Sequence, residues 1–254
     1  MTRRHLWLAL LAALATLATG TGVLALASPA LAQTLSLDLG TEGGSATGRI
    51  VQLVVLITIL SLAPSILVMM TSFTRIVVVL SFLRSALGIQ QTPPNAVLMS
   101  LALFLTLFIM MPTLQSVYDQ ALEPLIAEEI TEMEALERAS NPVRDFMLSH
   151  VREQDLALFI DLSDSPPIAT PEETPMRALI PAFMISELRR AFEIGFLLFL
   201  PFVIIDMVVA SVLMSMGMMM LPPILISLPF KLIFFVLVDG WYLIAGSLVQ
   251  SYGL

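Results

Sequence analysis

The sequence contains no cysteine and only two histidines among its 254 residues. Without cysteine the chain can form no disulfide, no thiolate nucleophile and no cysteine metal site. The histidines, His5 and His150, are far apart in the sequence, so histidine-based metal binding or acid–base catalysis has almost no side chains available. We therefore expect no metal, no cofactor and no enzyme active site.

Charge is also scarce. Only 13% of the residues are charged, and the net charge is −8. An acidic chain of this kind is poorly suited to the phosphates of nucleic acid, so we expect no nucleic-acid partner. Hydrophobic residues instead make up 57% of the chain, and the mean hydropathy is +0.92. This apolar excess is typical of a membrane protein.

The first 32 residues have the parts of a secretory signal. Two arginines lie near the start, an apolar run covers 6–18, and small residues end at Ala32. An uncleaved transmembrane helix is the alternative, but the apolar run is short and is followed by glycines and a proline. We predict a cleaved signal peptide over 1–32 and a flexible segment rich in Gly, Ser and Thr over 33–48.

Four long apolar blocks organise the rest of the chain. Most are near or beyond the roughly 20 residues that a helix needs to span a bilayer. They cover 50–70, 96–111, 194–221 and 224–249. We predict two helical hairpins, one over 49–112 and one over 191–254.

A polar, acidic segment over 113–190 separates the two predicted hairpins. We expect it to be helical, with one helix over 117–138, and its charges are typical of a solvated face. The stretch between the first two apolar blocks carries Arg75 and Arg84 and no acid, which predicts a cytoplasmic loop. The acidic segment would then be periplasmic.

Three charged residues interrupt the last two apolar blocks: Asp206, Lys231 and Asp239. Lys231 and Asp239 are eight residues apart, about 12 Å along one helix, which is too far for a direct salt bridge. Asp206 is the nearest candidate partner for Lys231. We interpret these charges as locks between helices or subunits, and a proton or ion relay is the alternative.

Methionine crowds the stretch "SVLMSMGMMMLPP" at 211–223, between the last two apolar blocks. Three interpretations compete for it. The stretch can be an ordinary apolar helix end, a thioether site for copper(I), or a deformable seal, because methionine side chains are flexible and unbranched. The methionines concerned are Met214, Met216, Met218, Met219 and Met220.

Three stretches, 70–112, 181–223 and 228–248, resemble the FliP family of the bacterial flagellar type III export apparatus. Virulence secretion systems carry a close counterpart, SctR. The resemblance covers roughly residues 49–251, and its most specific motif is "PAF..SELRRAF..GF" followed by "PF.IID". The motif positions in this chain are Pro181, Phe183, Ser186, Glu187, Phe192, Gly195, Pro201 and Phe202.

The resemblance implies an all-α, membrane-associated protein whose helical hairpins assemble into a ring-shaped export gate, a pentamer. The implied partners are FliQ, FliR, FlhB and FlhA, with FliO as an assembly factor. Unfolded flagellar proteins would cross this gate. The implied location is the bacterial inner membrane, with several spans, in the flagellar basal body.

The resemblance also implies site roles. The methionine-rich loop would act as a gasket that restricts leakage, with Gly217, Pro222 and Pro223 shaping it and the prolines stopping the helix before them. Glu187 would pack as a polar residue or line the channel. An ion-coupled transporter is the alternative from another class, although the two halves show no inverted repeat.

Overall fold

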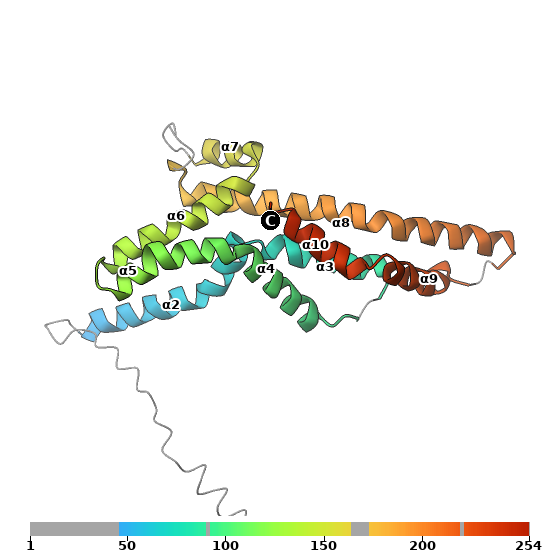
Figure 1. Cartoon of the computed structure of the whole chain (residues 1–254), viewed down its shortest axis with the longest axis horizontal. Helices are drawn as coiled ribbons and strands as arrows, with labels where there is room; N and C mark the ends of the chain where they lie inside the picture. The colour runs from blue at the N-terminus through green and yellow to red at the C-terminus, as the bar shows by residue number, and fades with distance from the viewer. Residues whose placement is uncertain (1–45, 90–91, 164–172, 219–220, 254) are drawn as a thin grey trace, which may run out of the picture. The chain divides into compact units, whose positions relative to one another are not determined.

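The computed structural model describes residues 46–89, 92–163, 173–218 and 221–253. Every regular element in these residues is a helix, which confirms the expected all-α fold (Figure 1). The predicted signal peptide and residues 33–45 lie outside the described residues. The helices are α2 (Ala46–Met70), α3 (Phe73–Leu87), α4 (Asn95–Val117), the π-helix η1 (Tyr118–Leu122), α5 (Glu123–Ile126), α6 (Glu132–His150), α7 (Glu153–Leu162), α8 (Met176–Ser215), α9 (Pro223–Leu237) and α10 (Gly240–Gln250).

The chain divides into two compact units, residues 1–58 and 59–254. In the first unit, residues 46–58 form the beginning of α2, where the Thr58 hydroxyl donates to the Val54 carbonyl at 2.7 Å. The second unit holds the rest of α2 and the other helices.

Helix α3 forms the centre of the second unit by packing along α8. Its buried apolar residues recur at helical spacing and give it one continuous apolar face. Gly88 ends α3 with φ 77°, a left-handed conformation that glycine adopts without strain, and its N–H donates to the Ser85 carbonyl at 3.1 Å. The buried apolar residues of α3 are Ile76, Val79, Leu80, Leu83, Ala86 and Leu87.

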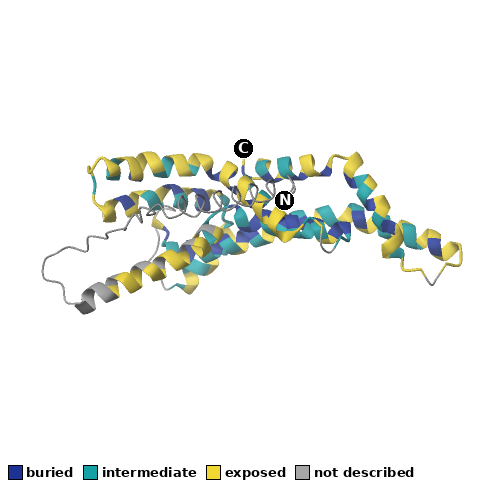
Figure 2. Ribbon diagram, turned by 90° about the horizontal axis from the view of Figure 1, so that it is seen from below, coloured by how far each residue is buried: buried dark blue, intermediate teal, exposed yellow. Residues whose placement is uncertain are grey.

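Helix α8 is a single helix of 40 residues that runs through both Pro181 and Pro201. At 1.5 Å per residue it is about 60 Å long, roughly twice the hydrocarbon thickness of a bilayer. Buried residues concentrate in its first half, where α3, α6 and α7 cover it, whereas exposed residues dominate its second half (Figure 2). One helix therefore joins a packed region to a largely uncovered apolar region.

The single helix predicted over 117–138 is wrong. The structure has the π-helix η1 and α5 up to Ile126, a break, and then α6 from Glu132. Glu128 adopts a positive φ of 58° in the break, and Thr131 starts α6 by accepting a hydrogen bond from the Glu134 N–H at 3.4 Å. The sequence Thr131-x-x-Glu134 is a helix-start signal that the hydrophobic pattern alone did not reveal.

The last apolar block is also not one helix. Helices α9 and α10 meet at a bend of 62° around Val238 and Asp239. Asp239 adopts φ 50°, so the helical path ends there and a new helix begins at Gly240.

Among the described residues, two helical runs are long and apolar enough to cross a membrane, Asn95–Ile126 and Met176–Ser215. The bent pair α9–α10 makes a third if it counts as one span. The first predicted block contributes only a shorter apolar stretch, Leu53–Ile66. By length and composition, the described residues therefore hold two or three candidate membrane spans.

Candidate functional site

A buried ion pair joins α3 to the family motif on α8. The Arg75 Nε atom donates to Glu187 Oε2 at 2.9 Å, and Arg75 Nη2 donates to Glu187 Oε1. Neither side chain is exposed to solvent. Two parallel hydrogen bonds fix the orientation of both side chains, which is the geometry that arginine and carboxylate favour.

Ser251 and Tyr252, which follow α10, also contact this ion pair. Arg75 Nη1 donates to the Ser251 hydroxyl at 2.9 Å, and the Arg75 guanidinium lies 3.8 Å from the centre of the Tyr252 ring. The Tyr252 hydroxyl donates to Glu187 Oε2. Burial, followed by the negative charge of Glu187, raises the pKa of the Tyr252 phenol far above its usual value, so the phenol remains a hydrogen-bond donor. We call Arg75, Glu187 and Tyr252 the buried cluster; Ser251, which also contacts Arg75, is exposed.

The structure corrects the sequence interpretation of Arg75. We expected Arg75 and Arg84 in a cytoplasmic loop, but both lie in helix α3, and Glu187 neutralises Arg75. The orientation argument therefore loses one of its two charges. A signal was present in the sequence, because Arg75, Val79 and Leu83 follow at intervals of four on an apolar helix face and a lone charge there needs a buried partner.

Ser186 joins α7 to α8. Its hydroxyl lies 2.7 Å from Asp155 Oδ2, to which it donates, and it accepts from the Arg152 N–H at 3.0 Å. Arg152 also forms an ion pair with Asp155 at 3.6 Å. Ser186 and Glu187, neighbours in the motif, thus hold the first half of α8 to two different elements.

Asp206 and Lys231 form a second ion pair, between α8 and α9. Lys231 Nζ donates to Asp206 Oδ2 at 2.6 Å and to the Ala86 carbonyl at 3.2 Å. The Ser227 hydroxyl donates to Asp206 Oδ1 at 2.5 Å. The Lys231 side chain is 4% exposed and the Asp206 side chain 34%, so the pair is half-buried. The structure thus places together the two charges that sequence spacing suggested as partners.

Asp239 lies apart from this pair. It is exposed at the bend between α9 and α10, and its side chain makes no cap hydrogen bond to α10. Among the described residues no cation forms an ion pair with it. Of these three charged residues, Asp206 and Lys231 therefore pair with each other, and Asp239 has no ion-pair partner among the described residues.

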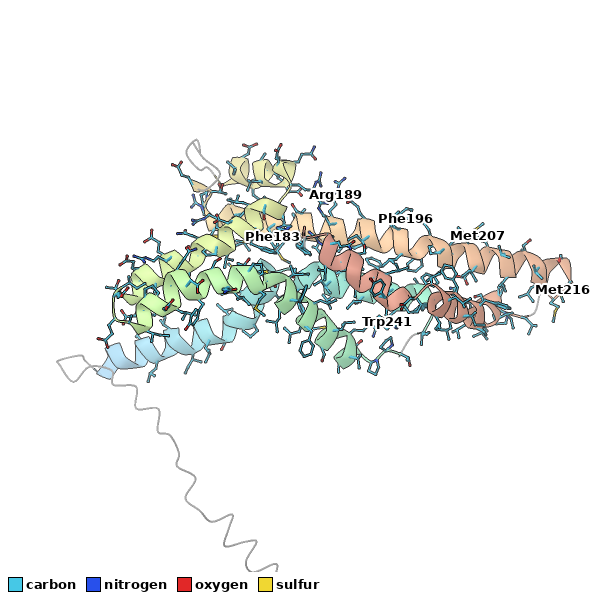
Figure 3. All side chains as sticks on the ribbon, viewed as in Figure 1. Phe183, Arg189, Phe196, Met207, Met216 and Trp241 are labelled. Atoms are coloured by element: carbon cyan, nitrogen blue, oxygen red, sulfur yellow. The ribbon has the colours of Figure 1, made fainter. Side chains whose placement is uncertain are left out.

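The methionine-rich stretch lies at the end of α8, where Figure 3 shows Met216 at the turn. The side chains of Met214, Met216 and Met218 are exposed. Met219 and Met220 lie outside the described residues. Gly217, with φ 75°, ends the helix: its N–H donates to the Met214 carbonyl at 3.1 Å, and the Met218 N–H donates to the Leu213 carbonyl at 3.0 Å. These two bonds form a Schellman motif.

The prolines have a different role from the expected one. Helix α8 stops at the Gly217 turn, before the prolines are reached. Pro222 precedes α9, and Pro223 is its first residue. Proline fits a first helical position because its fixed φ suits the helix and its missing N–H has no partner there. Pro222 and Pro223 therefore start the second helix of the hairpin instead of stopping the first.

The other motif residues on α8 fall into two groups. Phe183, Gly195 and Phe202 are buried, whereas Phe192 is exposed and Pro181 and Pro201 are half-buried. A Cβ atom on Gly195 would lie 2.5 Å from Cδ2 of Phe82, so only glycine permits this close approach of α3 and α8. Phe82 also packs edge-on against Phe192, with ring centres 5.1 Å apart.

Within the described part of the chain, no three side chains of His, Cys, Asp or Glu gather in a way that could hold a metal ion. The polar groups instead form hydrogen-bonded pairs such as Arg75 with Glu187 and Lys231 with Asp206. Such an arrangement can hold helices in register.

Comparison with known proteins gives a consistent result. The sequence profile of the FliP family matches residues 56–248. The flagellar biosynthetic protein FliP of Caulobacter vibrioides is 64% identical over 224 residues, which cover 88% of this chain and 84% of the relative. The protein of that name from Pectobacterium carotovorum is 58% identical, covering 83% of this chain and 82% of the relative. The Bacillus subtilis protein of that name is 56% identical, covering 80% and 91%.

Proposed function

This chain belongs to the FliP family, and from that premise we propose that it is a structural, non-enzymatic subunit of the flagellar type III protein export apparatus. In this proposal several copies, about five, form a ring in the inner membrane at the flagellar basal body. Unfolded flagellar proteins pass through the ring. The relatives from Caulobacter, Pectobacterium and Bacillus carry flagellar names, which favours the flagellar apparatus over a virulence secretion system.

The observation that carries the proposal is the hairpin of α8 and α9. The second half of α8 exposes many large apolar side chains, including Phe196, Leu197 and Met207. Figure 3 labels Phe196 and Met207 on this helix. Helix α8 is about twice as long as a bilayer is thick, so lipid alone cannot cover it. Neighbouring copies and the proposed partners FliQ, FliR, FlhB and FlhA would cover the remainder, with FliO assisting assembly.

The methionine-rich turn is proposed as the gasket of the ring. The Gly217 turn presents Met214, Met216 and Met218 at the tip of the hairpin, and Met219 and Met220 follow in the sequence. A single copy of this turn could seal little, but a ring of copies would bring many thioether side chains together. Apolar side chains can exclude water from a constriction, and flexible ones can rearrange around a passing chain.

Native mass spectrometry of the detergent-extracted protein, expressed with its neighbouring genes, tests the assembly. We expect a ring of several copies together with other small membrane subunits. A protein that remains a monomer when expressed with those genes would contradict the proposal, because a single hairpin cannot enclose a channel.

A leakage assay tests the gasket separately. Changing Met218, Met219 and Met220 together to Ala should raise ion leakage across the inner membrane while export of flagellar proteins continues. Met207→Ala is the matched control, because Met207 is an exposed methionine of α8 away from the turn. Equal leakage in the triple variant and the wild type would rule out the gasket while leaving the ring intact.

A further inference from the structure

The apolar helices carry few charged residues. Some of these form an ion pair within the chain, and others do not. We define the apolar helices as α3, α4, residues 194–215 of α8, α9, and α10 with Asp239. Arg75 is neutralised by Glu187, and Asp206 by Lys231. Two charges remain, Arg84 and Asp239, and neither forms an ion pair within the described residues.

Arg84 lies in the last turn of α3 and is half-buried. Its Nη1 atom donates to the Asn95 Oδ1 atom at the start of α4. This hydrogen bond fixes the guanidinium but leaves its positive charge uncompensated, because an amide is neutral. The carbonyl end of α3 attracts a cation only weakly.

Asp239 is the opposite case. Its exposed carboxylate lies at the start of α10, on a bend lined by large apolar side chains. Val236 is 74% exposed, Leu237 80% and Tyr242 74%. A surface this apolar is normally covered in the mature protein. Covering it would remove water from Asp239, and a desolvated carboxylate needs a cation or several donors.

We propose that Arg84 of one copy forms an ion pair with Asp239 of the neighbouring copy. The inference rests on the proposed ring and assigns two residues to its subunit interface. The contact uses different surfaces of the two copies, so it is head-to-tail, and head-to-tail contacts form a ring when the rotation from copy to copy closes. It also brings the negative end of α3 towards the positive end of α10, which is a favourable arrangement of the helix dipoles.

Charge complementarity favours a second copy over an unrelated partner. In the apolar helices, each copy carries one cation, Arg84, and one carboxylate, Asp239, without an ion-pair partner among the described residues. Every interface between neighbouring copies would therefore contain one Arg84 and one Asp239. An unrelated subunit would have to supply both a carboxylate for Arg84 and a cation for Asp239. The pairing also leaves the apolar helices with no net charge from Arg84, Asp206, Lys231 and Asp239, as burial in an assembly requires.

Cross-linking tests the contact directly, because the native chain has no cysteine. A variant with both Arg84→Cys and Asp239→Cys is expressed with the neighbouring genes and treated with a short bismaleimide. We expect a ladder of covalent oligomers on a denaturing gel. Cells that express the two single variants together should give dimers only, and either single variant alone should give monomers.

The outcomes separate this inference from the proposed function. A ring in native mass spectrometry with no ladder, or with cross-links only inside one chain, would overturn the Arg84–Asp239 contact and leave the ring. Failure to form a ring in the wild type would overturn both.

Charge reversal gives a second measurement that does not depend on cysteine chemistry. Arg84→Asp and Asp239→Arg should each reduce ring formation at least tenfold, and the double variant should recover most of it. Arg138→Glu serves as the control, because Arg138 is exposed on α6 and pairs with Glu134 of its own helix. A double variant as defective as the single ones, although folded by circular dichroism, would contradict the pairing.

Discussion

The two halves of α8 belong to one continuous helix, yet their surroundings differ. The first half, 176–195, is held by the buried cluster, by the Ser186 contacts and by close packing on α3. The second half, 196–215, buries only Phe202 and Leu213, and the Asp206–Lys231 pair is its main polar attachment. Other helices of the same chain cover much of the first half. The second half keeps many apolar side chains exposed.

The largest expected effect is in the first half. Arg75→Met should destabilise the folded protein by about 3–5 kcal/mol, because it leaves the fully buried Glu187 carboxylate without its cation. Denaturant unfolding in detergent measures the change. The double variant with Glu187→Met should recover much of the loss, and a double variant no more stable than the single one would contradict this explanation.

The close approach of α3 and α8 gives the next effect. Gly195→Ala should cost roughly 1–3 kcal/mol, because the new methyl group meets the Phe82 ring. Thermal unfolding measures it. Adding Phe82→Leu should relieve part of the cost. Gly246→Ala is the control, because no atom lies within 4 Å of a Cβ at that position.

The buried cluster also predicts a pH dependence. Burial and Glu187 raise the pKa of Tyr252 in the folded protein, so the folded state keeps a proton that the unfolded state loses near pH 10. Stability should therefore be complete below about pH 10 and fall by up to about 1.4 kcal/mol per pH unit above it. Unfolding curves at pH 9 to 11 measure the slope. Tyr252→Phe should be less stable at pH 8 and lack this contribution, whereas Tyr242→Phe, at an exposed site, should keep it.

A smaller loss is expected in the second half. Asp206→Asn should cost about 1–2 kcal/mol, because it leaves the nearly buried Lys231 ammonium without a counter-ion, while an amide oxygen can still accept a hydrogen bond from it. Denaturant unfolding measures the stability, and flagellar export in cells measures function. A gate subunit should lose assembly or remain largely functional. Normal assembly with a specific loss of ion coupling would favour the transporter alternative.

The smallest effect on the isolated chain is expected at its uncovered apolar surface. Phe196→Ser should change the free energy of unfolding of the detergent-solubilised monomer by less than about 0.5 kcal/mol, because Phe196 is exposed. Ring formation, followed by native mass spectrometry, should nevertheless fall. Loss of monomer stability with normal ring formation would show that Phe196 packs against residues of its own chain and not against another subunit.

The charges show how far sequence reasoning reaches. The Asp206–Lys231 partnership was predictable, because few charges interrupt the last two apolar blocks and Asp239 is too far along the chain. The Arg75–Glu187 pair was missed, because Arg75 was assigned to a loop and the acidic segment offers many other carboxylates. Glu187 was singled out only through the resemblance, and nothing in its motif identifies α3 as its partner.

The ends of helices show the same limit. The prolines at 222 and 223 suggested a break between two helices, but not which helix they belong to. Gly217 ends α8 through two backbone hydrogen bonds, and this depends on local geometry that composition does not encode. Similarly, the block 224–249 was predicted as one helix, although Asp239 and Gly240 form an Asp-Gly pair, which is a common turn signal, at the bend.

The sequence by itself determined the class of this protein: apolar, helical and free of cysteine. These properties follow from composition and short-range periodicity, which are local. Only the tertiary structure decided which charges are satisfied. Arg75 and Glu187 are 112 residues apart in the chain, and their contact exists because α3 and α8 pack side by side. Within the described residues, the same packing leaves Arg84 and Asp239 open, because an ion pair requires two side chains within a few ångströms and the fold brings no carboxylate or cation to either.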